Sequence, residues 1–144
     1  MRYIRFVMET KPKRILAVDD DPSLRHTLKH LLRSRGYDVE EARDGDEALR
    51  KLQTARFDLV FLDLTMPKVS GDEVMKRLSP AFLEGTPVVL LTGREKDQDV
   101  MRGYAMGAAY YLVKPVSNEK VIDIADYLIG DGHEHDKEAL RRRL

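Results

Sequence analysis

Five short hydrophobic runs, separated by stretches of helical periodicity, constrain the fold of this chain most strongly. The runs are rich in Val, Ile, Leu and Phe and lie at residues 15–18, 59–62, 88–91 and 110–113, with a weaker one near 37–42. Near-continuous hydrophobicity is typical of strands covered on both faces, which is the habit of parallel sheets. The sequence therefore predicts five buried parallel strands.

Hydrophobic residues at helical spacing fill the segments between these runs. The stripes are Leu24, Leu28, Leu31 and Leu32; Ala48, Leu49 and Leu52; Val74, Met75 and Leu78; residues 100–106; and Val121, Ile122, Ala125, Leu128 and Ile129. Gly36 is expected to end the first helix, and Ser79-Pro80 to stop the third. Since parallel strands need crossovers of fixed hand, five strands alternating with five helices predict a doubly wound α/β domain with helices on both faces.

Composition narrows the class of protein further. The chain has 144 residues, 25 basic and 25 acidic side chains and no cysteine. This length suits one domain, and a net charge of zero provides no overall field toward nucleic acid or an anionic membrane. Without cysteine, disulfide scaffolds and thiol chemistry are excluded. No run approaches the roughly 20 apolar residues that span a bilayer, and the N-terminus does not resemble a secretory signal, so we expect a cytoplasmic protein without membrane contact.

Reactive or ionisable residues follow four of the five predicted strands. They are Asp19 and Asp20 after the first strand, Asp63 after the third, Thr92 after the fourth and Lys114 after the fifth. A single acid after a strand is most often a turn residue or a helix cap. In an open parallel sheet, however, ligands bind outside the carboxyl ends of the strands, so the coincidence predicts one shared site.

The chemistry of these residues points to phosphoryl transfer. Three converging carboxylates repel one another unless a cation compensates, and Mg²⁺ prefers such oxygen ligands. Lys114 supplies a movable positive charge, and Thr92 supplies a hydroxyl that can donate to an anionic oxygen. A carboxylate in this setting is a plausible nucleophile toward phosphorus, giving an aspartyl phosphate.

The third consecutive aspartate has a different expected role. Asp21 directly precedes Pro22, and helices favour Asp at the N-cap followed by Pro at the first helical position. The spacing therefore assigns Asp21 to the cap of the first helix, and leaves Asp19 and Asp20 for the metal.

The chain resembles the receiver domain of two-component response regulators, of the single-domain type found in chemotaxis regulators. The stretches that carry the likeness are "ILAVDDDPSLR", "DGDEAL", "DLVFLDLTMPKVSGDE", "VVLLTGR" and "GAAYYLVKP", in family-like order over about residues 13–129. The resemblance implies a flavodoxin-like strand order 2-1-3-4-5. It also divides the chain into an N-terminal extension (1–12), a receiver domain (13–130) and a polar C-terminal tail (131–144).

Carried over position by position, the resemblance implies a role for each site residue. The implied roles are phospho-acceptor for Asp63; Mg²⁺ ligands for Asp19, Asp20, Asp63 and the Thr65 backbone carbonyl; phosphoryl contacts for Thr92 and Lys114; switch residues for Thr92 and Tyr111; and a cis peptide bond before Pro115. Val116 stands where Phe is frequent, and Tyr110 competes with Tyr111 for the switch role, although spacing favours Tyr111. Thr65 and Arg94 occupy positions that tune dephosphorylation in the family.

The resulting hypothesis is a phosphorelay signalling domain. A histidine kinase or histidine phosphotransfer protein would phosphorylate Asp63, and the change would remodel a protein-binding face made by the fourth helix, the last strand and the fifth helix. Such a protein catalyses only its own phosphorylation and dephosphorylation. No direct nucleic-acid binding is expected, and a phosphorylation-dependent homodimer is a further expectation. No residues remain for a recognisable output domain, which favours a stand-alone receiver or phosphorelay intermediate.

Three alternatives remain open. The chain could be the receiver part of a longer response regulator, or an interaction module that works without phosphorylation. A Mg²⁺-dependent phosphohydrolase is disfavoured because Thr65 replaces the second acid that common aspartyl-phosphate phosphatases carry. His26 and His30, the "HEH" at 133–135 and the arginines at 141–143 are interpreted as solvated polar positions rather than ligand sites.

Overall fold

A five-stranded parallel sheet forms the centre of the molecule. The computed structural model describes residues 11–93 and 97–130. The strands are β1 (Arg14–Val18), β2 (Asp38–Ala42), β3 (Leu59–Asp63), β4 (Val88–Thr92) and β5 (Tyr110–Val113). Their order across the sheet is β2-β1-β3-β4-β5. This confirms the predicted doubly wound fold and its strand order.

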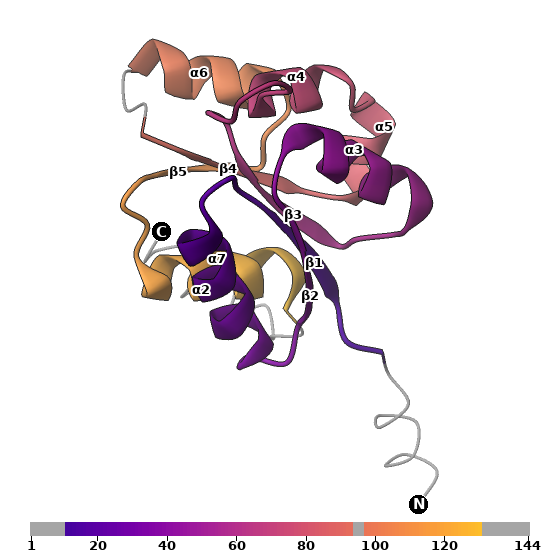
Figure 1. Cartoon of the computed structure of the whole chain (residues 1–144), viewed down its shortest axis with the longest axis vertical. Coiled ribbons are helices and arrows are strands. Elements are labelled where there is room, and N and C mark those ends of the chain that lie inside the picture. Colours follow the sequence, from indigo (N-terminus) through magenta and orange to yellow (C-terminus); the bar gives the residue numbers. More distant parts are fainter. Residues whose placement is uncertain (1–10, 94–96, 131–144) are drawn as a thin grey trace, which may run out of the picture.

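Helices cover both faces of the sheet (Figure 1). They are α2 (Pro22–Arg33), α3 (Gly45–Thr54), α4 (Gly71–Lys76), α5 (Pro80–Gly85), α6 (Asp97–Ala105) and α7 (Asn118–Ile129). Helices α2 and α7 lie together on one face, whereas α3, α4, α5 and α6 lie on the other. Within the described ranges, no helix is long and apolar enough to cross a membrane.

Burial on both faces explains why the strands read as continuous hydrophobic runs. In β1, Leu16 and Val18 pack with the residues on the α3 and α4 side, whereas Ile15 and Ala17 pack with those on the α2 and α7 side. All five residues of β3 are buried, including the terminal Asp63. Burying each large apolar side chain is worth about 1.5–3 kcal/mol, so the two clusters hold the sheet between its helical layers.

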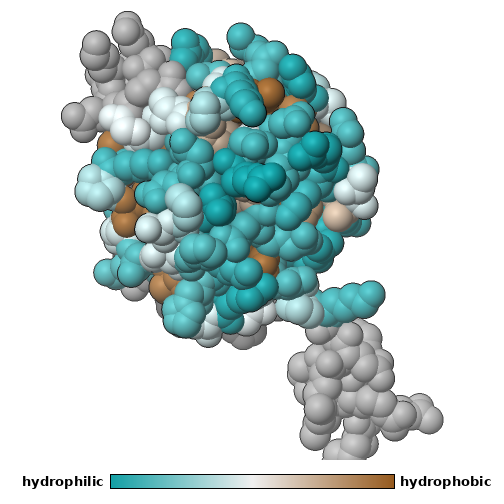
Figure 2. All heavy atoms as spheres, in the orientation of Figure 1, coloured by the Kyte–Doolittle hydropathy of each residue, from teal (hydrophilic) through white to brown (hydrophobic). Residues whose placement is uncertain are grey.

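The outer surface contrasts with this interior. Figure 2 shows a face dominated by hydrophilic residues, with isolated hydrophobic ones between them. Among the described residues, the large hydrophobic side chains that remain exposed are Met101 and Tyr104, both on α6. Helix α6 therefore presents apolar surface that the fold itself does not use.

The segment around Ser79-Pro80 departs from the prediction of five helices. Helix α4, which corresponds to the third predicted helix, ends at Lys76. The Ser-Pro pair then begins an additional helix, α5, so the described residues form six helices where five were predicted. The Ser79 side chain accepts a hydrogen bond from the Phe82 backbone amide, and Pro80 occupies the first turn. Ser followed by Pro is a strong helix start, so this pair both follows the end of α4 and begins α5.

Several predicted features lie outside the described residues. These features are the polar tail at 131–144, residues 1–10 of the predicted extension, and Arg94. Residues 11–13, which precede β1, are exposed.

Candidate functional site

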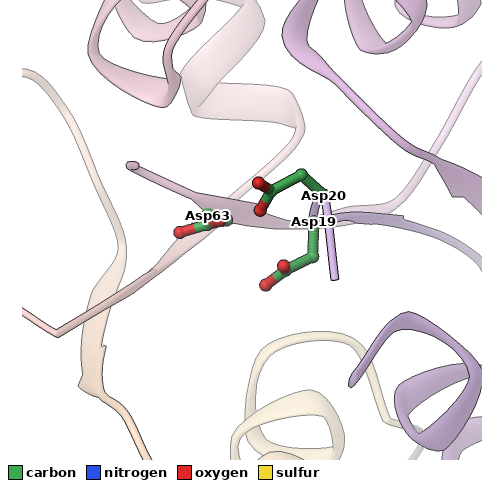
Figure 3. A group of neighbouring side chains, drawn as sticks. All are labelled: Asp19, Asp20 and Asp63. Atoms are coloured by element: carbon green, nitrogen blue, oxygen red, sulfur yellow. The ribbon is translucent and has the colours of Figure 1, made fainter. Parts of the chain in front are cut away.

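The ends of β1 and β3 bring three carboxylates together. Val18 of β1 pairs with Leu62 of β3, so the residues that follow in each chain lie side by side at the same edge of the sheet. Oxygen atoms of Asp19, Asp20 and Asp63 all lie within 4.8 Å of one another (Figure 3). Asp19 and Asp63 are buried, and Asp20 is exposed. The carboxylate cluster is therefore exposed to solvent at Asp20 and buried at Asp19 and Asp63.

The two oxygens of Asp63 have different surroundings. Oδ1 accepts hydrogen bonds from the backbone amide of Thr65 at 3.1 Å and from its hydroxyl at 3.3 Å. Oδ2 is buried and has no hydrogen-bond partner in the described part of the chain. Because buried polar atoms are rarely left without a partner, this oxygen is a candidate contact for a ligand.

Lys114 supplies positive charge to the same place. Its Nζ lies 2.9 Å from Asp19 Oδ2 and 3.4 Å from Asp63 Oδ1. Burial alone would lower the pKa of the Lys114 ammonium, but the hydrogen bond and charges of the two carboxylates outweigh it and raise the pKa above its ordinary value. The lysine therefore stays charged and offsets part of the repulsion between the acids.

Asp63 has a raised pKa because of its burial and the remaining repulsion from neighbouring carboxylates. Burial raises the pKa of Asp63 from 3.8 to about 6, with a further upward contribution from the neighbouring Asp19 carboxylate. The hydrogen bond from the Thr65 amide and the charge of Lys114 oppose the rise without cancelling it. Such an acid is poised to gain a cation, because a divalent ion would favour its ionised form.

Thr92 completes the edge at the end of β4. It is fully buried, and its backbone carbonyl accepts a hydrogen bond from the Lys114 amide at 2.7 Å. This bond continues the pairing of β4 with β5, in which Thr92 lies opposite Val113. The sheet therefore places Thr92 and Lys114 next to each other on the side of the site away from β1.

The fold separates the two adjacent tyrosines of β5. Tyr111 is buried in the cluster beneath α3, α4 and α6, whereas Tyr110 packs against the cluster on the α2 and α7 side. On β4, Thr92 alternates with Leu91 and so shares the face of Leu90, which belongs to the Tyr111 cluster. Tyr111, the tyrosine that spacing favours for the predicted switch role, therefore shares a face of the sheet with Thr92.

Two glycines lie in close contact with Tyr111 and with the end of β3. A Cβ placed on Gly103 of α6 would lie 2.9 Å from the Tyr111 ring, and one on Gly71 would lie 2.3 Å from the Asp63 carbonyl oxygen. Glycine at these positions lets α6 approach Tyr111 and lets α4 approach the end of β3. Neither close approach is predicted by the sequence, because a glycine inside a helical pattern carries no signal for the neighbour that it contacts.

Two further positions have the local structure that the sequence favoured. Asp21 is the N-cap of α2, and its Oδ1 accepts a hydrogen bond from the Ser23 amide at 3.0 Å. The peptide bond between Lys114 and Pro115 is cis. The side chain of Asp21 is thus hydrogen-bonded within α2, and the carboxylate cluster that could hold a metal ion consists of Asp19, Asp20 and Asp63.

The donor set fits a hard divalent cation. The cluster has three carboxylates, one of which faces solvent, and the described residues provide no hydrogen-bond partner for Asp63 Oδ2. This arrangement matches the preference of Mg²⁺ for a few carboxylates and retained waters. No nitrogen or sulfur ligand belongs to the cluster, which argues against a zinc site.

Comparison with known proteins assigns the class to which this fold and site belong. Residues 15–126 match the response regulator receiver domain, so the chain belongs to the receiver domain family of two-component response regulators. It is 38% identical over 109 residues to the transcriptional regulatory protein DltR of Streptococcus agalactiae, covering 76% of this chain and 48% of that protein. It is 41% identical over 109 residues to the alkaline phosphatase synthesis transcriptional regulatory protein PhoP of Bacillus subtilis, covering 76% and 45%. The chain thus spans about half the length of these curated relatives.

Solved structures show the same family at full domain length. The chemotaxis response regulator CheY4 of Vibrio cholerae superposes with a TM-score of 0.76 at 37% identity, covering 82% of this chain and 99% of that one. The response regulator TrrA of Thermotoga maritima, solved in complex with Mg²⁺ and BeF, gives a TM-score of 0.72 at 34% identity, covering 81% and 99%. These comparisons confirm the predicted resemblance and the predicted signalling class.

Proposed function

We propose that this domain accepts a phosphoryl group on Asp63. The observation that carries the proposal is the state of this side chain, which is buried, has a raised pKa and keeps Oδ2 free of partners among the described residues. Lys114 lies within 3.4 Å of the other oxygen, Oδ1. The ionised carboxylate therefore has one oxygen held by donors and one available as a nucleophile.

The transfer forms one bond and breaks another. An oxygen of Asp63 attacks the phosphorus of a phosphohistidine, the new O–P bond forms, and the P–N bond breaks with the electron pair leaving on the imidazole. The Lys114 ammonium, already paired with the carboxylates, and the Thr92 hydroxyl at the neighbouring strand end are the groups of this chain that would meet the added phosphoryl oxygens. Their preset positions lower the reorganisation needed as charge moves onto those oxygens.

Mg²⁺ is the proposed cofactor. Asp19, Asp20 and Asp63 would hold it through their carboxylates, and the Thr65 backbone carbonyl is the further ligand that the family resemblance implies. When bound, the ion neutralises charge shared between the acids and the transferred phosphoryl group. Its retained waters suit the exposed side of the cluster at Asp20.

The proposed output is a change on the α6–β5–α7 face. The bound phosphoryl group carries about two negative charges at neutral pH in place of the single charge of the Asp63 carboxylate. Thr92, at the end of the neighbouring strand β4, supplies a hydroxyl that can respond to it. Tyr111 shares the Thr92 face and packs against Gly103 of α6, so a shift of Thr92 would be felt by that helix. Met101 is 71% exposed and Tyr104 43% exposed on α6, which supports this surface as the site for a downstream protein.

The proposed partners follow from the family. A histidine kinase or histidine phosphotransfer protein would donate the phosphoryl group, and a protein would bind the α6–β5–α7 face, with a phosphorylation-dependent homodimer as one form of such binding. We propose no catalysis beyond the domain's own phosphorylation and dephosphorylation. The same chemistry would operate in a stand-alone receiver and in the receiver part of a longer regulator.

Acetyl phosphate provides a direct test. Wild-type protein incubated with acetyl phosphate and Mg²⁺ should gain one labile phosphoryl group, detected by intact-mass spectrometry, and should lose it at alkaline pH. Asp63→Asn should show no adduct, whereas Asp46→Asn, a change on the exposed side of α3, should behave as wild type. An adduct of equal amount on Asp63→Asn would refute the assignment.

The interaction face has a separate test. Beryllofluoride with Mg²⁺ mimics the phosphoryl group, so partner capture from a cell extract should differ with and without it. Replacing Met101, the most exposed large hydrophobic residue described, by Lys should reduce the beryllofluoride-dependent capture while leaving phosphorylation by acetyl phosphate intact. Capture that ignores both beryllofluoride and Met101→Lys would favour the phosphorylation-independent alternative.

A further inference from the structure

Arg25 connects the acidic loop to the edge strand of the sheet. It lies in the first half of α2, and its side chain is only 14% exposed. Its Nη1 donates a hydrogen bond to the backbone carbonyl of Asp19 at 2.8 Å, and its Nε lies 3.2 Å from Glu41 Oε1 on β2. The guanidinium therefore bridges the end of β2 and the loop that follows β1.

Glu41 is a firm anchor for this arginine. Its carboxylate also meets Lys29 Nζ at 3.2 Å and His26 Nδ1 at 3.4 Å, and its backbone carbonyl accepts a hydrogen bond from Lys51 at 2.6 Å. Burial would raise the pKa of Glu41, but the hydrogen bond from Lys29 and the surrounding positive charges lower it below its ordinary value. The anchor is thus ionised at neutral pH and held through both side chain and main chain.

The hydrogen bond to Asp19 controls a particular peptide unit. The Asp19 carbonyl and the Asp20 amide belong to one planar group, so fixing that carbonyl fixes the orientation at which the chain enters Asp20. The other groups of Asp19 are already held: its amide donates to the Ala42 carbonyl at 3.1 Å, and its Oδ1 accepts from the Asp21 amide at 2.9 Å. Arg25 supplies the remaining restraint, next to the exposed carboxylate of the cluster.

We propose that Arg25, anchored by Glu41, is a positioning residue that orients Asp20 toward the cation by holding the Asp19–Asp20 peptide. Within the described residues, no hydrogen bond or ion pair joins Arg25 to a carboxylate oxygen of the cluster. Because it acts through the main chain, its planar fork matters more than its charge. The inference rests on the proposed Mg²⁺ function and adds to it a residue outside the ligand set.

Mg²⁺ titration of matched variants tests the inference. Residues that orient metal ligands from outside the ligand set are worth about 10–100-fold in metal affinity, so Arg25→Ala should weaken Mg²⁺ binding in calorimetry by about tenfold or more. Lys29→Ala is the control, since Lys29 also pairs with Glu41 but no hydrogen bond links it to the acidic loop. It should leave Mg²⁺ affinity unchanged. Each variant is titrated only under conditions where circular dichroism and urea unfolding show it fully folded.

Two further measurements separate positioning from charge or stability. Arg25→Lys keeps the charge but lacks the fork, so it should remain several-fold weaker for Mg²⁺ and should fold in case Arg25→Ala does not. In metal-free protein, amide hydrogen exchange at Asp20 and Asp21 should accelerate in Arg25→Ala and Arg25→Lys, but not in Lys29→Ala.

The outcomes distinguish this inference from the function on which it rests. If wild type binds Mg²⁺ and the Arg25 variants bind it equally well, positioning by Arg25 is wrong and the metal site stands. Full recovery of affinity in Arg25→Lys would also overturn it, because charge alone would then explain the effect. If wild type fails to bind Mg²⁺ at all, the proposed metal function fails and the inference with it.

Discussion

The raised pKa of Asp63 makes the stability of the metal-free protein depend on pH in a direction opposite to most carboxylates. The folded domain holds the Asp63 proton more tightly than the unfolded chain, because the pKa rises from 3.8 to about 6 on folding. Below pH 3.8 the side chain is neutral in both states and costs nothing. As pH rises from 3.8 to about 6 and beyond, ionisation of Asp63 in the buried site costs folding free energy, so the contribution of Asp63 to stability falls.

The magnitude follows from the size of the pKa change. At about 1.4 kcal/mol per pH unit, the ionised side chain costs up to about 3 kcal/mol at about pH 7.5 and about 1 kcal/mol at about pH 4.5. Asp63→Asn removes this ionisation. Relative to wild type, the variant should therefore gain about 2 kcal/mol more at the higher pH than at the lower one. Any pH-independent change in the free energy of unfolding that the buried side-chain amide of Asp63→Asn causes is the same at both pH values and cancels in that difference.

Urea unfolding in EDTA at the two pH values measures the effect. Asp46→Asn is the matched control, since Asp46 is exposed on α3 and, among the described residues, forms an ion pair only with Arg50 at 3.4 Å, a surface contact worth about 0–1 kcal/mol. Its difference from wild type should change little between the two pH values. Saturating Mg²⁺ should stabilise wild type and shrink the advantage of Asp63→Asn. An advantage equal at both pH values, or larger at low pH, would refute the reasoning.

Other substitutions test separate parts of the site by urea unfolding and Mg²⁺ titration. Lys114→Met removes the ammonium that lies 2.9 Å from Asp19 Oδ2. The free energy of unfolding of the metal-free protein at neutral pH should therefore fall by about 1–3 kcal/mol, and Mg²⁺ should restore part of this loss. An unchanged free energy of unfolding would mean that the lysine does not compensate the charge of the carboxylates. Gly71→Ala forces a methyl group against the Asp63 carbonyl and should cost about 1–3 kcal/mol and slow phosphorylation by acetyl phosphate; a neutral result would show that α4 can move away freely. Asp21→Ala removes the helix cap and should cost about 1 kcal/mol without changing Mg²⁺ affinity; lost Mg²⁺ binding in a folded protein would instead make Asp21 a ligand.

Local patterns in the sequence were sufficient for the doubly wound class of fold and for grouping the polar residues that follow its strands. Periodicity distinguishes strand from helix within a few residues, and the stripe of α2 places its buried face correctly, as Leu28 and Leu32 show. On α7, Val121 and Ala125 are buried as predicted, but the predicted stripe included Ile122 and omitted the fully buried Ile124. Residues after parallel strands meet at one edge, which is why Asp19 and Asp63 could be grouped although they are far apart in the chain. Helix α5 was missed because one Ser-Pro signal serves both an end and a start.

Other properties depend on distances that no local pattern encodes. Arg25 reaches the Asp19 carbonyl because α2 and the end of β2 converge there, and an arginine in a helix carries no sequence signal for that contact. Which of Tyr110 and Tyr111 shares the face of Leu90 and Thr92 depends on the pairing register of β4 and β5. The sequence by itself determined which residues could form a phosphoryl-transfer site, because residue type and strand ends are local. Only the tertiary structure decided how deeply Asp63 is buried and which of its oxygens has no partner among the described residues, because burial and hydrogen bonding are set by neighbours distant in the chain.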